Sequence, residues 1–178
     1  IEEKYSEFLN WLNDVAIDNN MYSLRAAKSY SIKDAGWMEF IEYKDCKNEK
    51  EISCFYYRIG ILLCILYTTN GVDIHNENII AHGDMPILVD LETFIHPVFS
   101  EEYQPEQAAI IALKEIDKSV TKNILLPTYV ASRDSNKVFD LGGLSATKEQ
   151  EAPFATKFMK DYGTDEVRVK MQHATIDT

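Results

Sequence analysis

The stretch of sequence on which the fold depends reads Gly71-Val72-Asp73-Ile74-His75-Asn76-Glu77-Asn78 and, further along, Leu88-Val89-Asp90-Leu91-Glu92-Thr93. Asp73 and Asn78 lie five positions apart, and Asp90 lies twelve positions beyond Asn78. Two short strands are predicted at 78–81 and 86–89, with His82-Gly83-Asp84 as the turn of a hairpin. A chain that returns across such a hairpin can bring Asn78 and Asp90 together, near the loop that starts at Asp73.

This spacing suits a phosphoryl transfer assisted by magnesium. The reaction needs a carboxylate near the attacking hydroxyl group and oxygen ligands that hold Mg²⁺ against phosphates. The catalytic loop of kinases has the same Asp-x-x-x-x-Asn core, followed by a metal-binding aspartate after a hairpin. The alternative is structural, because Asp and Asn are common turn residues and Asp73 would then only close the turn after Gly71. The combination of helix, loop, hairpin and strand-end aspartate favours the phosphotransferase site.

Two further residues of the stretch have several possible roles. His75 is a candidate metal ligand, base or loop-orienting group, and an orienting or phosphate-contacting role is favoured. His82 and His96 are spaced too irregularly to form a zinc site with it. Glu92 is either a second acidic group at the metal or a solvated loop residue.

The elements around this stretch predict an α+β fold. Helical periodicity predicts helices at 5–15, 49–69 and 107–117, and alternation predicts strands at 37–43 and 167–171. The helix 49–69 carries so wide an apolar stripe that it is expected to be buried on most sides. Gly71 is expected to end it in a left-handed cap.

Composition limits the classes of function. The chain has 178 residues and a formal net charge of −11, which argues against general nucleic-acid binding. Three cysteines without C-x-x-C spacing argue against a disulfide framework or zinc site. The longest apolar run, 59–67, is too short for a membrane span, and no secretory signal opens the chain. These features favour a cytoplasmic protein.

The chain resembles the dehydratase domain of class II lanthipeptide synthetases (LanM). The segments that carry the resemblance are Tyr56-Tyr57-Arg58-Ile59-Gly60-Ile61-Leu62-Leu63, Gly71 to Ala81, Pro86 to Thr93 and Gly36-Trp37-Met38-Glu39-Phe40. The resemblance implies a kinase-like, specifically lipid-kinase-like, catalytic lobe with the N-lobe mostly absent. Residues 1–178 would be a fragment of this domain. Residues 37–97 would hold the hinge, long helix, catalytic loop and metal-binding segment, and 98–178 the activation-type segment and remainder.

The resemblance also implies an activity. Members of the family use ATP and Mg²⁺ to phosphorylate Ser and Thr of a precursor peptide with a leader, then eliminate the phosphate to form dehydroalanine or dehydrobutyrine. Carried over by motif, Asp73, His75 and Asn78 are catalytic-loop residues, Asn78 and Asp90 hold Mg²⁺, and Glu92 belongs to the same acidic site. A zinc cyclase domain usually follows in the same parent chain.

The sequence departs from the family in two places. The family's nucleotide-clamping lysine, in a Lys-Pro-Arg segment, has no counterpart here, so half of the ATP cleft is expected to be missing. Asp117 and Asn123 stand where the family has an Arg and a Thr implicated in elimination, which puts elimination in doubt but not phosphorylation. The alternatives are a kinase-like phosphotransferase acting on a small alcohol and a non-catalytic pseudokinase that docks a peptide.

Overall fold

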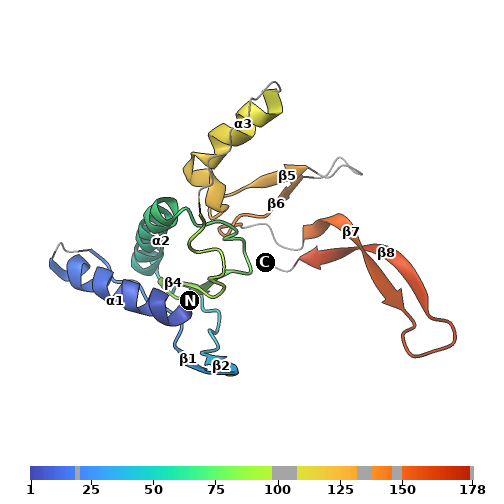
Figure 1. The fold of residues 1–178 in the computed structure, drawn as a ribbon, viewed down its shortest axis with the longest axis horizontal. Helices are drawn as coiled ribbons and strands as arrows, with labels where there is room; N and C mark the ends of the chain where they lie inside the picture. Colours follow the sequence, from blue (N-terminus) through green and yellow to red (C-terminus); the bar gives the residue numbers. More distant parts are fainter. Residues whose placement is uncertain (19–20, 98–107, 132–137, 146–149, 177–178) are drawn as a thin grey trace.

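The long helix α2, Glu49–Thr69, runs through the centre of the computed structural model, which describes residues 1–18, 21–97, 108–131, 138–145 and 150–176 (Figure 1). It begins at Asn48, whose side chain accepts a hydrogen bond from the Glu51 backbone N–H. Glu49 and Glu51 add negative charge to the first turn, where the helix dipole favours it. Its predicted bounds are confirmed.

The predicted cap of α2 is one residue out of place. Asn70, not Gly71, adopts the left-handed conformation, with φ 58°, because an asparagine tolerates this region well. Gly71 is needed for a different reason. A Cβ there would lie 2.8 Å from both the Leu66 side chain and the Phe94 carbonyl oxygen, so only glycine lets the chain turn back at this point.

The core lies between α2, the first helix α1 (Glu2–Asp18) and the segments that follow α2. Tyr5 and Leu9 of α1 pack here, and the Tyr5 ring meets the Phe94 ring edge-on at 4.7 Å between centroids. The buried members of this cluster are Tyr5, Leu9, Leu24, Ile59, Leu62, Ile65, Leu66, Ile74, Ile79, Leu88, Leu91, Phe94 and Leu125. Three of them, Ile74, Leu88 and Leu91, belong to the stretch that decides the fold, so the core fixes its position.

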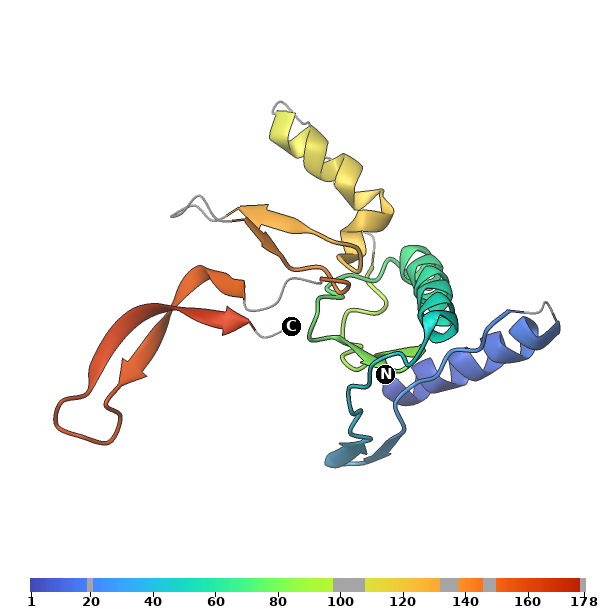
Figure 2. The same cartoon turned by 180° about the vertical axis from the view of Figure 1, so that it is seen from behind.

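The described strands form four separate two-stranded antiparallel sheets, and together with the helices they confirm the α+β class (Figure 2). The pairs are β1 (Ser29–Ile32) with β2 (Ala35–Met38), β3 (Ile79–His82) with β4 (Met85–Leu88), β5 (Tyr129–Ala131) with β6 (Val138–Asp140), and β7 (Gln150–Lys160) with β8 (Arg168–Ile176). The helix α3 (Ala108–Asp117) and the short 3-10 helix η1 (Val120–Asn123) precede β5. The predicted start of α3 at Gln107 lies outside the described residues.

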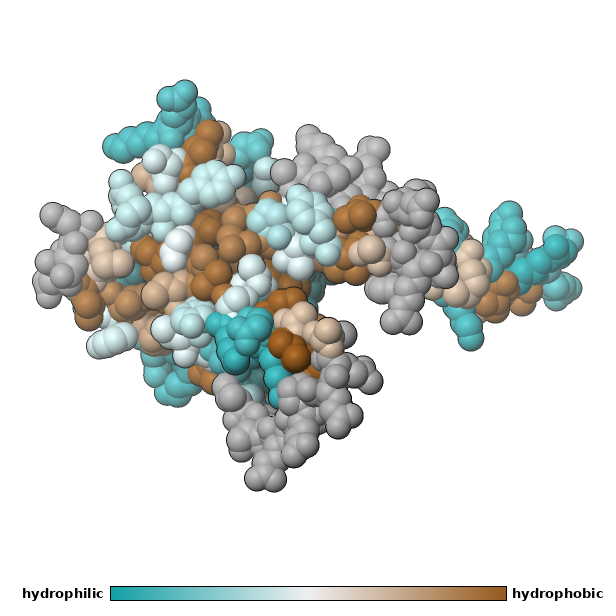
Figure 3. Space-filling view, turned by 90° about the horizontal axis from the view of Figure 1, so that it is seen from above, coloured by the Kyte–Doolittle hydropathy of each residue, from teal (hydrophilic) through white to brown (hydrophobic). Residues whose placement is uncertain are grey.

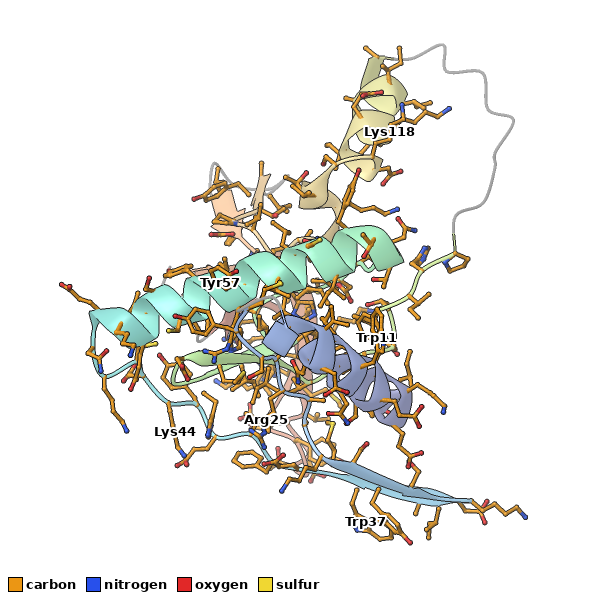
Figure 4. The ribbon with its side chains drawn as sticks, turned by 90° about the vertical axis from the view of Figure 1, so that its left-hand side faces the viewer. Trp11, Arg25, Trp37, Lys44, Tyr57 and Lys118 are labelled. Atoms are coloured by element: carbon orange, nitrogen blue, oxygen red, sulfur yellow. The ribbon has the colours of Figure 1, made fainter. Side chains whose placement is uncertain are left out.

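The predicted strand 37–43 is wrong over most of its length. Strand β2 ends at Met38, and the chain then leaves the hairpin. The Glu39 side chain is bound to the segment that precedes β1. Its carboxylate accepts a hydrogen bond from the Lys28 N–H and pairs with Arg25. Farther on, the Lys44 backbone forms an isolated parallel β-bridge with His82 of β3. Figure 4 shows Trp37 on the β1–β2 hairpin, pointing away from the helices.

The expectation that α2 is buried on most sides is also wrong. One face is buried, through Cys54, Arg58, Ile59, Leu62, Ile65 and Leu66. The opposite face is exposed, including Ile52, Tyr56 and Tyr67. Among the described residues α2 alone has the length and apolar composition of a membrane-crossing helix, a property that core helices of water-soluble proteins share. Its buried face, which includes a charged arginine, packs against the other elements of the core.

Candidate functional site

The candidate catalytic loop follows α2 and is anchored by its own apolar residue. Ile74 is fully buried in the core, whereas its neighbour Asp73 is exposed and His75 is half-buried. A loop whose middle residue is buried presents the flanking polar side chains from a fixed point. The geometry is therefore suited to positioning Asp73 and His75 rather than leaving them on a free loop.

Asp73 and Asn78 close the loop on itself. Asp73 has φ 61°, a left-handed conformation that is uncommon for a residue other than glycine. Its carbonyl oxygen accepts a hydrogen bond of 2.8 Å from the side-chain Nδ2 of Asn78. The amide nitrogen of Asn78 is used in this bond. Its Oδ1 accepts no hydrogen bond from any described residue. Asn78 is buried, so its orientation is fixed.

The β3–β4 hairpin brings Asn78 and Asp90 to the same end, as predicted. Ile79 pairs with Leu88. One residue beyond them, the Val89 N–H donates to the Asn78 carbonyl at 3.1 Å. Asp90 follows immediately and is exposed. Gly83, with φ 65°, forms the turn at the other end of the hairpin.

A second set of hydrogen bonds, between Val72 and Thr93, joins the other ends of the same two segments. The Val72 N–H donates to the Thr93 carbonyl at 3.1 Å, and the Thr93 hydroxyl donates to the Val72 carbonyl at 2.7 Å. The residues between the two pairing points are therefore side by side. They include every residue that the sequence predicted for the site: Asp73, His75, Asn78, Asp90 and Glu92. We call this region the 73–92 site.

His75 is oriented from within the loop. Its Nδ1 accepts a hydrogen bond of 3.2 Å from the Glu77 N–H, which requires an unprotonated Nδ1 and leaves Nε2 to carry the proton in the neutral ring. The His75 carbonyl accepts from the Asn78 N–H at 3.0 Å, and His75 also forms an isolated antiparallel bridge with Gly142. The ring is thus held by the loop, and its Nε2 is the donor of the neutral ring.

The acidic groups of the site suit a magnesium ion whose other ligands are water and phosphate. The Asp90 carboxylate accepts a hydrogen bond of 3.3 Å from the Glu92 N–H, and Asp90 and Glu92 both face solvent. Among the described residues, no three His, Cys, Asp or Glu side chains form a metal-binding group. Magnesium does not need one, since it commonly takes one or two protein oxygens and completes its shell with water and phosphate. The Asn78 amide oxygen and the Asp90 carboxylate fit that donor set.

Sequence reasoning missed a clasp that holds the loop from behind, which we define as Asn123, Asp140, Gly142 and Gly143. The Ile74 N–H donates to the Asn123 carbonyl at 2.9 Å. The Asp140 Oδ1 accepts from the N–H groups of Thr128 at 2.8 Å and Gly142 at 3.0 Å. A Cβ on Gly143 would lie 2.7 Å from the Ile74 carbonyl oxygen. Only the adjacent glycines in Asp140-Leu141-Gly142-Gly143 hinted at this close approach.

The two residues aligned with the family's elimination residues lie elsewhere. Asn123 is 2% exposed, and its Oδ1 accepts a hydrogen bond from the Leu125 N–H, so it serves the clasp. Asp117 ends α3 and lines a cavity of about 30 Å³ with Asn70, Ser119 and Lys122. That volume holds a water molecule or two. Because nucleotide-sized ligands fill several hundred Å³, the cavity is no nucleotide pocket.

The β3–β4 hairpin is tied to α2 by one buried cation. The Arg58 guanidinium donates to the Asp84 carbonyl and carboxylate and to the Ser23 carbonyl, each at 2.8 Å. The arginine is 8% exposed and also lies 5.2 Å from the centre of the Tyr22 ring. These contacts fix the turn of the hairpin whose other end carries Asn78 and Asp90.

Comparison with known proteins supplies a family. The family described as "Domain of unknown function (DUF4135)" matches residues 1–178. The lacticin 481/lactococcin biosynthesis protein LcnDR2 of Lactococcus lactis subsp. lactis is 31% identical over an alignment of 127 residues, and the match covers 68% of this chain. The match covers 14% of that relative's length, so the chain corresponds to a small part of it. These matches confirm the resemblance to the class II lanthipeptide synthetases, and the chain belongs to the DUF4135 family.

Proposed function

We propose that this chain is part of a kinase-like dehydratase of lanthipeptide biosynthesis, which phosphorylates Ser and Thr of a precursor peptide and then eliminates the phosphate. The observation that carries the proposal is the 73–92 site. Two pairs of backbone contacts, Asn78 with Val89 and Val72 with Thr93, bring the loop and the strand-end aspartate together. The biosynthetic role named for the L. lactis relative supports the substrate class.

Each site residue has a role that follows from its position. The exposed Asp73 carboxylate orients the substrate hydroxyl and accepts its proton as the hydroxyl oxygen attacks phosphorus. Asn78, through its amide oxygen, and Asp90 hold Mg²⁺. Bound ATP and Mg²⁺ supply the phosphoryl group and neutralise charge on the phosphates. His75, with its positioned Nε2, contacts a phosphate oxygen, and Glu92 adds negative charge beside the metal.

The second step removes the phosphate just added. A proton leaves the α-carbon of the phosphorylated residue, its electrons form the carbon–carbon double bond, and the phosphate departs from the β-carbon. Asn123 is buried in the clasp and Asp117 lines a water-sized cavity, so neither meets a phosphate at the 73–92 site. We propose that the groups that hold the leaving phosphate come from the 73–92 site and from the larger enzyme of which this chain is part.

The compartment we propose is the cytoplasm. All three cysteines, Cys46, Cys54 and Cys64, are free thiols, as expected in a reducing compartment. ATP, the proposed phosphoryl donor, is plentiful there.

Mass spectrometry of the precursor peptide tests this proposal. The full-length enzyme is incubated with ATP, Mg²⁺ and the peptide, as wild type and as Asp73→Asn. The wild type should give a peptide that has lost water at Ser and Thr, and a brief reaction should show the phosphopeptide. The Asp73→Asn enzyme should give neither product. Full dehydration by this variant would overturn the role of Asp73, and phosphorylation of small alcohols in place of the peptide would favour the other phosphotransferases.

A further inference from the structure

The β7–β8 hairpin is a long ribbon that extends away from the rest of the protein (Figures 1 and 2). It pairs in regular register from Ala155 opposite His173 to Lys160 opposite Arg168. No third strand of the described chain pairs with it. Residues 156–172 are exposed throughout, so both faces and both outer edges of the ribbon meet solvent.

The two faces of the ribbon differ in character. Side chains alternate along each strand, so directly paired residues share a face. One face carries Met159 opposite Val169 and, beside them, Met171 opposite Lys157. The other face, which we call the basic face, carries Lys160, Arg168 and Lys170, with Phe158 opposite Lys170. Figure 3 shows teal side chains interspersed with brown ones along the segment that extends at the right of the view.

The basic face holds like charges together without a counter-ion. Lys160 lies directly opposite Arg168, an arrangement that destabilises a sheet, and Lys170 is the next residue on the same face. No described carboxylate lies within salt-bridge distance of any of the three. The nearest acidic residues in sequence, Asp161, Asp165 and Glu166, lie in the connection between the strands. Three clustered, unpaired cations in a chain of net charge −11 call for an acidic partner.

We propose that the basic face binds an extended acidic peptide segment that adds to the edge of β8 and carries carboxylates at every second position. An added strand would satisfy open backbone groups at the edge, and its alternate side chains would lie on one face beside Arg168 and Lys170. The inference goes beyond the proposed catalytic function and involves none of its site residues.

Two other kinds of partner fit less well. A membrane-surface ribbon needs one wholly apolar face, but Lys157 lies opposite Met171 on the less basic face, and an anionic membrane would repel a chain of net charge −11. A nucleic acid would meet three cations on a strongly acidic chain, and its phosphates would be repelled elsewhere. A short acidic peptide needs only the ribbon.

Fluorescence anisotropy of the complete 178-residue chain tests the proposal. The probe is a labelled peptide that alternates Thr and Glu, and its control alternates Thr and Gln. The ribbon variant is K160Q/R168Q/K170Q. The matched control, K4Q/K33Q/K50Q, also removes three exposed cations, so both variants change the net charge from −11 to −14. Circular dichroism verifies that both variants are folded.

The Glu peptide should bind the wild type, and its affinity should fall as salt is added. The ribbon variant should bind about tenfold more weakly or worse, since three charge contacts are lost, while the matched control should stay within about twofold. The chain with Asp73→Asn should bind as the wild type does, which separates this test from that of the catalytic site. Equal binding of the Gln peptide, equal weakening in both triple variants, or tighter binding to phosphatidylserine vesicles or single-stranded DNA would overturn the proposal.

Discussion

At the scale of single residues, the site depends on an asparagine that has two tasks. The Asn78 amide nitrogen donates to the Asp73 carbonyl at 2.8 Å, and we propose that its amide oxygen is a ligand of Mg²⁺. An aspartate has the same size but cannot do both, because an ionised carboxylate only accepts hydrogen bonds. The left-handed φ of Asp73 is maintained by this bond and by the burial of Ile74 next to it.

Asn78→Asp separates the two tasks. The carboxylate keeps oxygen ligands for the metal but has no N–H for the Asp73 carbonyl, so the loop loses the bond that closes it. We expect phosphorylation to fall by about 10- to 100-fold, with a free energy of unfolding lower by about 1–3 kcal/mol. The rate is measured against Mg²⁺ concentration in the full-length enzyme. An unchanged rate at all concentrations would contradict the role of the amide nitrogen.

Gly143→Ala tests the clasp behind the loop. The added methyl group would lie 2.7 Å from the Ile74 carbonyl oxygen, so the clasp or the loop must move. We expect a free energy of unfolding lower by about 1–3 kcal/mol, together with reduced phosphorylation. Gly60→Ala is the matched control, because its methyl group meets nothing within 4 Å and should stabilise α2 by up to about 1 kcal/mol. Denaturant unfolding measures both, and equal effects would argue against the clasp.

At the scale of elements, the β3–β4 hairpin is the part that joins the core to the site. Its turn is held by Arg58 of α2, its strands are buried through Ile79, Ile87 and Leu88, and its open end carries Asn78 and Asp90. Two contacts hold the turn. One is the hydrogen bond from Arg58 of α2 to Asp84, and the other is the backbone β-bridge between Lys44 and His82. The hairpin is therefore fixed at the end opposite the chemistry.

Arg58→Ala should lower the free energy of unfolding by more than a typical surface substitution does. The substitution leaves the carbonyl oxygens of Ser23 and Asp84 without their donor and removes the partner of the Asp84 carboxylate. We expect a cost of about 2–4 kcal/mol. Arg58→Lys keeps the charge but not the planar fork of donors, so it should recover only part of the loss. A cost below about 0.5 kcal/mol for Arg58→Ala in denaturant unfolding would show that the hairpin has another anchor.

Glu39 makes the attachment of the β1–β2 hairpin depend on pH. The Lys28 N–H that donates to its carboxylate, together with the Arg25 guanidinium, holds the pKa of Glu39 below its ordinary value of 4.5, against the opposite effect of burial. A lowered folded-state pKa means that the ionised group stabilises the fold above the unfolded value. This stabilisation is lost as the pH falls through the folded pKa.

The stability difference between wild type and Glu39→Gln should therefore shrink as the pH falls from about 6 to about 3. Glu42→Gln is the control, since the Glu42 side chain is 69% exposed and reaches Lys44 only at 3.5 Å. Denaturant unfolding at a series of pH values measures both variants. A Glu39→Gln difference that is constant with pH would refute the linkage.

The elements with local signals were predictable from the sequence. Helix α2 has an Asn48 cap and a long apolar stripe, and the hairpin has Gly83 at its turn. The end of β2 at Met38 was not predictable, because the Glu39 side chain bonds to a residue eleven positions back, and alternation cannot show this. The clasp depends on contacts between Ile74 and residues near 123 and 143, which no local pattern encodes. The hairpin beside the loop was predictable because both lie close together in the sequence.

At the scale of the whole molecule, the chain carries a site and several surfaces that face solvent. The match covers 14% of the L. lactis relative's length, and the cavity beside Asp117 is far smaller than a nucleotide. The apolar outer face of α2 and the β7–β8 ribbon lie on different parts of the surface (Figure 1). We propose that the larger enzyme completes the ATP cleft around the 73–92 site, while the site's own oxygen ligands belong to this chain.

Titration calorimetry of the full-length enzyme with ATP, in the presence and absence of Mg²⁺, tests that central claim most directly. The wild type is compared with Asp90→Asn and with Asp34→Asn, which removes an equal charge from the exposed turn between β1 and β2. We predict that Mg²⁺ strengthens ATP binding to the wild type and to Asp34→Asn, and that Asp90→Asn loses this dependence. Magnesium-dependent binding that persists unchanged in Asp90→Asn would contradict the account.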